Sequence, residues 1–64
     1  MKAAELRELS AEDLKVKLEE LRKELLNVRF QKATQQLMDH NRIKEVKRDI
    51  ARVLTVLREK GVKL

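Results

Sequence analysis

The feature that most restricts the fold of this chain is its lack of residues that break helices. The sequence contains no proline, and its single glycine is Gly61, close to the last residue. Because proline and glycine disfavour helix interiors most strongly, helices can occupy most of the preceding chain. One aromatic residue and 42% charged residues are also atypical of a β-sheet. We therefore predict an all-α fold.

Apolar residues at helical spacing predict a first long helix over residues 10–37. Five of them recur at steps of four and three residues, in the manner of a coiled-coil seam: Leu14, Leu18, Leu21, Leu25 and Val28. Ser10 suits the N-cap of this helix, since its hydroxyl can accept from the free backbone N–H groups of the first turn. Residues 1–9 also carry leucines at helical spacing, but so short a helix is unstable alone. We expect a short helical segment packed on the rest.

A second long helix is predicted over residues 42–60. Its apolar residues form one stripe, again at steps of three and four: Ile43, Val46, Ile50, Val53 and Leu57. The apolar pattern lapses through polar residues before this helix, and the turn is placed at residues 38–41, with Asp39 as the preferred N-cap. Gly61 suits the position after the helix, so residues 61–64 are expected to be a loose tail. The whole chain is then one domain, an antiparallel hairpin of two long helices with a coiled-coil-like seam.

The first long helix carries a second apolar stripe, which its partner helix cannot cover. This stripe comprises Leu26, Phe30, Ala33 and Leu37. At about 100° per residue it lies about 130° around the helix from the leucine seam. These four residues are therefore candidates for an interface with the short N-terminal segment, with another protein or with a second copy of this chain.

Basic residues gather in a wedge on another side of the second helix from its apolar stripe. They are Lys44, Lys47, Arg48, Arg52 and Arg58. Like charges four residues apart repel by roughly 0.2–0.5 kcal/mol per pair in an isolated helix, which an anionic partner would relieve. The net charge is also uneven: residues 1–24 carry −1 (six Lys or Arg, seven Asp or Glu) and residues 25–64 carry +6 (ten against four). A solvated face has the same composition, but the asymmetry favours a polyanion, most simply nucleic acid.

Several classes of function find no support in the sequence. No cysteine is present and His40 is the only histidine, so neither a disulfide nor a zinc site with the usual ligands is expected. No Gly-rich phosphate loop or nucleophile motif occurs, and we predict no catalytic residue, no cofactor and no metal. No apolar run is long enough for a membrane span or signal peptide, which favours the cytoplasm. Binding to a membrane surface is a weaker alternative, because aromatic anchors are lacking.

Three blocks of the sequence are specific enough to compare with known families. They are KAAELRELSAEDL, LRKELLNVRFQKAT followed by QL, and RIKEVKRDIARVLTVLRE, and together they cover nearly the whole chain. Each resembles the corresponding block of the large-subunit ribosomal protein twenty-nine family in its bacterial form. The last is the most specific, through the run KRDIAR at residues 47–52. The chain departs from the family pattern at Gln35, where glycine is frequent, and at residues 39–40, where Asn-Pro is frequent.

The resemblance implies a structural protein that binds ribosomal RNA (rRNA) on the large subunit and serves translation as a scaffold. It implies a position near the polypeptide exit tunnel, as a monomer beside another ribosomal protein. The residues that match RNA-facing positions of the family are the basic Lys44, Lys47, Arg48 and Arg52 and, near the turn, Asn27, Arg29, Gln31 and Gln36. Periodicity alone leaves an alternative open: a homodimer in which two hairpins form a four-helix bundle with weak or no affinity for nucleic acid.

Overall fold

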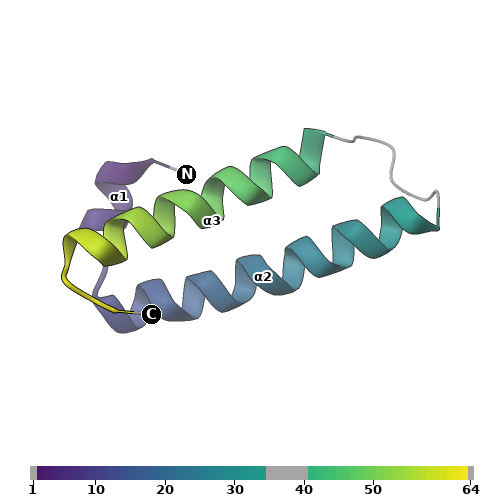
Figure 1. Ribbon diagram of the computed structural model, residues 1–64. Helices are drawn as coiled ribbons and strands as arrows, with labels where there is room; N and C mark the ends of the chain where they lie inside the picture. Colours follow the sequence, from purple (N-terminus) through teal and green to yellow (C-terminus); the bar gives the residue numbers. More distant parts are fainter. Residues whose placement is uncertain (1, 35–40, 64) are drawn as a thin grey trace.

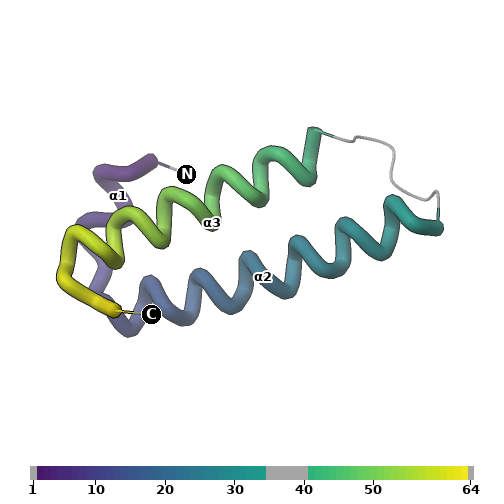
Figure 2. Tube along the Cα trace, in the orientation of Figure 1, coloured from purple at the N-terminus to yellow at the C-terminus, as the bar shows by residue number. Residues whose placement is uncertain are grey.

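The structure is a computed structural model that describes residues 2–34 and 41–63. Within these ranges the chain forms three helices and no strand: α1 (Ala3–Arg7), α2 (Ala11–Ala33) and α3 (Asn41–Glu59). α2 and α3 run antiparallel, and α1 packs on α3 at the end where α2 begins (Figure 1). At the other end α2 extends beyond the start of α3 (Figure 2). The rod measures 39 × 19 × 14 Å. The predicted all-α hairpin with a short N-terminal helix is confirmed.

The start of α2 is defined by the expected cap. The hydroxyl oxygen of Ser10 accepts a hydrogen bond from the backbone N–H of Asp13 at 3.1 Å. The carboxylates of Glu12 and Asp13 lie in the first turn, where they complement the positive end of the helix dipole. The Ser10 cap and the acidic first turn therefore start α2 as a helix separate from the short α1.

The end of α2 is marked by Thr34, which follows the last helical residue, Ala33. The hydroxyl of Thr34 donates toward the carbonyl oxygens of Phe30 (3.2 Å) and Gln31 (3.1 Å). The backbone N–H of Thr34 also donates to the Phe30 carbonyl at 3.1 Å, and the hydroxyl supplies a further donor at the helix terminus, where carbonyls begin to lack intrahelical partners. The sequence assigned residues 35–37 to the same helix, and these lie outside the described residues.

The end of α3 is a Schellman motif around Gly61. Gly61 adopts a φ of 78°, its N–H donates to the carbonyl of Arg58 (3.0 Å), and the N–H of Val62 donates to that of Leu57 (3.0 Å). Val62 is half-buried and packs against the core. Here the structure differs from the expected loose tail, because the apolar contact that accompanies this motif holds Val62 in place. Asp39, expected to cap the start of α3, lies outside the described residues.

The apolar core lies at the end of the rod where all three helices meet. Its buried side chains are Leu6, Leu14, Leu18, Leu21, Val53, Val56 and Leu57. Val28 and Val46 are also buried but do not belong to this cluster. Leu25, Ile43 and Ile50, which the sequence placed on the two seams, are only half-buried. The half of the hairpin that contains the start of α3 therefore has a thinner core.

The short helix α1 explains the burial of Val56, which the sequence did not place on the apolar stripe of α3. Val56 is 1% exposed and belongs to the same cluster as Leu6 of α1. Arg7 ties α1 to the end of α3: its Nε and Nη2 donate to the carboxylate of Glu59 at 3.0 and 3.3 Å, while Lys60 Nζ donates to the Arg7 carbonyl at 3.2 Å. The hydrogen bond from Arg7 lowers the pKa of the Glu59 carboxyl below its usual value.

Candidate nucleic-acid interface

The helical repeat of α3 places its apolar and basic residues on opposite sides. Val46, Val53 and Leu57 point into the protein and are fully buried. At about 100° per residue, the predicted cations project from the other side. All four are exposed, and we call them the basic face: Lys44, Lys47, Arg48 and Arg52. At 1.5 Å per residue they cover about 12 Å along the helix axis, enough to meet several phosphates.

The four cations of the basic face differ in their intramolecular partners. Arg52 Nη1 lies 3.6 Å from Oδ1 of Asp49, so its charge is partly compensated within α3. Within the part of the chain that the structure describes, Lys44, Lys47 and Arg48 form no ion pair or side-chain hydrogen bond. Their charges are therefore available to an external anion.

Small side chains leave room between the long cationic ones. Ala51 is exposed and lies about one turn after Lys47 and Arg48. One turn further on, the Thr55 hydroxyl donates to the Ala51 carbonyl at 2.8 Å, which folds that side chain against the backbone. A phosphate could thus approach the α3 backbone closely at this point, with cations on both sides.

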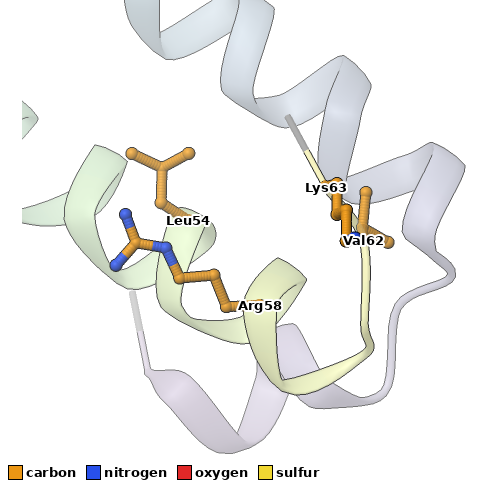
Figure 3. Close-up of a pocket in the computed structure, with 4 residues that line it drawn as sticks. All are labelled: Leu54, Arg58, Val62 and Lys63. Atoms are coloured by element: carbon orange, nitrogen blue, oxygen red, sulfur yellow. The ribbon is translucent and has the colours of Figure 1, made fainter.

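Arg58 extends the basic surface toward the end of α3, and the site residues inferred from the family resemblance did not include it. With Leu54, Val62 and Lys63 it lines a surface hollow of about 420 Å³ (Figure 3). The spacing of Arg58 already placed it on the basic side of the helix. Lys63 gave no such signal, because it follows the helix and has no periodicity.

The polar residues proposed on α2 do not form one surface with each other. Asn27 and Arg29 are exposed and Gln31 is half-buried. Asn27 and Gln31 share a side of the helix, since they are four residues apart, whereas Arg29 lies about 160° away from each. Gln36 lies outside the described residues.

The second apolar stripe of α2 is open to solvent. Leu26 is 70% exposed and Phe30 is 68% exposed, and Ala33 is also exposed. Leu37 lies outside the described residues. Of the three partners that the sequence left open for this stripe, the N-terminal segment is excluded, because α1 packs on α3.

The chemistry available to this surface is that of fixed charges and apolar contact. In residues 2–34 and 41–63, no three His, Cys, Asp or Glu side chains come together in a way that could hold a metal ion. None of the described helices is both long and apolar enough to cross a membrane. No charged or polar residue among those described is buried, so the ionic groups remain in contact with solvent.

Comparison with known proteins identifies close relatives over nearly the full length. Residues 4–60 match the model of a family described as ribosomal L29 protein. The chain is 55% identical over 64 residues to the large ribosomal subunit protein uL29 of Coprothermobacter proteolyticus, covering all of both chains. It is 61% identical over 61 residues to uL29 of Nitratidesulfovibrio vulgaris, covering 95% of this chain and 100% of that protein. The uL29 of Corynebacterium diphtheriae is 56% identical over 62 residues, with 97% and 82% covered.

Proposed function

The chain belongs to the ribosomal L29 protein family, and we propose that it binds large-subunit rRNA through the basic face of α3. As a member of this family it is a structural, non-enzymatic component of the large ribosomal subunit, located with the ribosome in the cytoplasm. Its partners are rRNA and other ribosomal proteins. The proposal concerns which surface meets which partner.

The observation that carries the proposal is the set of exposed cations without intramolecular partners. Lys44, Lys47 and Arg48 project from the side of α3 opposite the core and are not neutralised by the described part of the chain. The phosphate backbone of RNA supplies the counter-charge, and contacts of this kind fix position without reading base sequence. Asn27, Arg29, Gln31 and Gln36 are proposed as additional contacts, on the basis of the family resemblance alone.

The affinity for rRNA is expected to depend steeply on salt. If the basic face and Arg58 neutralise four or five phosphates, the logarithm of the association constant should fall with the logarithm of the salt concentration with a slope of about −3 to −4. Titrating protein-free large-subunit rRNA at several KCl concentrations, with excess transfer RNA as competitor, measures this slope. Affinity that does not change with salt would contradict the electrostatic proposal.

The exposed stripe of Leu26 and Phe30 is proposed as the contact with a neighbouring ribosomal protein, near the polypeptide exit tunnel. Two large apolar side chains with about two thirds of their surface exposed form a patch that is typical of interaction sites. The stripe lies on α2, whereas the basic face lies on α3. One hairpin could thus contact RNA and protein at the same time, as a monomer within the subunit.

The alternative occupant of this stripe is a second copy of the chain, in a four-helix bundle. Sedimentation equilibrium of the isolated protein separates the two proposals. We expect the protein to remain a monomer at about 10–100 μM. Even a weak dimer, with a free energy of association of about −6 kcal/mol, would begin to form in this range and would be detected. A tight dimer that Phe30→Ser dissociates would instead assign the stripe to self-association. Lys32→Ser, which removes an exposed side chain about 160° around α2 from Phe30, is the matched control.

A further inference from the structure

The first turns of α3 contain an arginine whose charge is used within the protein. Arg42 is the second residue of α3, and its Nη2 forms an ion pair with Oε1 of Glu24 on α2. Its Nη1 lies 3.2 Å from Oε2 of Glu45, one turn further along α3. One guanidinium thus bridges two carboxylates on different helices. The planar, forked group suits this role because it can present separate N–H donors to each carboxylate.

Two features of α3 indicate that this bridge helps to hold the start of α3 against α2. The first turn has no acidic residue, although it contains Arg42 and Lys44 at the positive end of the helix dipole, where cations are unfavourable. Glu24 supplies the missing negative charge from the neighbouring helix. The apolar core is also thin here, since Ile43 is only half-buried and the main cluster lies toward the other end of the rod. The buried apolar side chains described in this half are Val28 and Val46, so apolar packing restrains this end of α3 less than the end near α1.

We propose that Arg42 is a positioning residue of the RNA interface, which holds the start of α3 against α2 through Glu24. Lys44, Lys47 and Arg48 follow within six residues, so the height and rotation of this turn determine where their charges are presented. In this proposal Arg42 does not contact RNA, because the two terminal nitrogens of its guanidinium, Nη1 and Nη2, are directed to carboxylates. This inference rests on the proposed function of the basic face.

The test compares Glu24→Gln with Glu20→Gln, an exposed carboxylate one turn earlier on α2. Both variants raise the net charge by one, which by itself favours RNA binding. Loss of positioning should nevertheless make Glu24→Gln bind protein-free large-subunit rRNA about two- to fivefold more weakly, the range of exposed ion pairs. Glu20→Gln should bind equally well or slightly better. Arg42→Gln should also weaken binding two- to fivefold, without changing the salt slope.

The outcomes separate this inference from the proposed function. If Arg42 instead contacts a phosphate, Glu24→Gln frees the Arg42 guanidinium and RNA binding becomes tighter. In that case Arg42→Gln also makes the salt slope shallower by about 0.7–0.9. Either result would overturn the positioning role. Arg48→Gln, measured in the same series, should make the slope shallower by that amount. If Arg48→Gln leaves the slope unchanged, the basic face itself is wrongly assigned.

Discussion

Reversing two charges of the basic face, in the variant Lys47→Glu with Arg48→Glu, is expected to lower the affinity for large-subunit rRNA by at least about 100-fold. Each charge-assisted hydrogen bond that is lost costs about 1.5–3 kcal/mol, so two correspond to about 3 kcal/mol or more. The new carboxylates also repel phosphates. The variant should therefore fail to incorporate into the large subunit. Filter binding and co-sedimentation with subunits through a high-salt wash measure the two effects.

A control with the same net charge shows whether position matters. Lys15→Glu with Lys23→Glu changes the net charge by the same amount but places the reversals on exposed sites of α2. This control should lose affinity only through the weakened long-range field, which salt screens beyond about 8 Å at physiological ionic strength. Equal losses in the two variants would mean that net charge, and not the basic face, determines binding. Far-ultraviolet circular dichroism should be unchanged in both, since none of the four residues is buried.

The fold could be predicted from the sequence to the extent that it depends on local rules. Ser10 predicted the start of α2, because N-caps require particular residue types. Gly61 predicted the end of α3, because a left-handed backbone favours glycine. Val56 could not be assigned to the core in this way. Its burial depends on α1 packing on α3, and packing between two segments far apart in the sequence leaves no trace in the periodicity of either one.

The candidate site shows the same division between local and tertiary information. Spacing alone placed Lys44, Lys47 and Arg48 on one side of α3, where the structure exposes them. Spacing could not show that Arg52 shares its charge with Asp49, nor that Arg42 bonds to Glu24 across the hairpin. The pair of Arg52 and Asp49 has the i, i+3 spacing that permits contact, but whether it forms depends on rotamers. The pair of Arg42 and Glu24 depends on the relative height of two helices, which no pattern within one helix specifies.

Replacing Leu57 by alanine is expected to destabilise the isolated protein severely. Leu57 is fully buried in the cluster where all three helices meet, and truncation of a buried leucine costs about 2–5 kcal/mol. At about 0.05–0.15 kcal/mol per residue, a chain of this length has only about 3–10 kcal/mol in total. The melting temperature should fall by about 8–40 °C, at about 4–8 °C per kcal/mol. Thermal unfolding followed by circular dichroism measures this change.

The matched control is Leu26→Ala, because the same atoms are removed from a side chain that is 70% exposed. Its effect on stability should stay within about 0.5 kcal/mol. Similar losses for the two variants would contradict the assignment of the core to the end of the rod that contains α1.

RNA binding adds a second distinction between Leu57→Ala and the charge reversals. A ligand that binds only the folded state stabilises it by mass action, so excess rRNA should restore the helical structure of Leu57→Ala. The apparent association constant is the intrinsic one multiplied by the fraction of protein that is folded. The refolded chain nevertheless contacts the same phosphates as the wild type. The salt slope of Leu57→Ala should therefore match that of the wild type, apart from the direct effect of salt on folding. The Lys47→Glu and Arg48→Glu variant should instead have a slope that is shallower by about 1.4–1.8, because two phosphate contacts are missing.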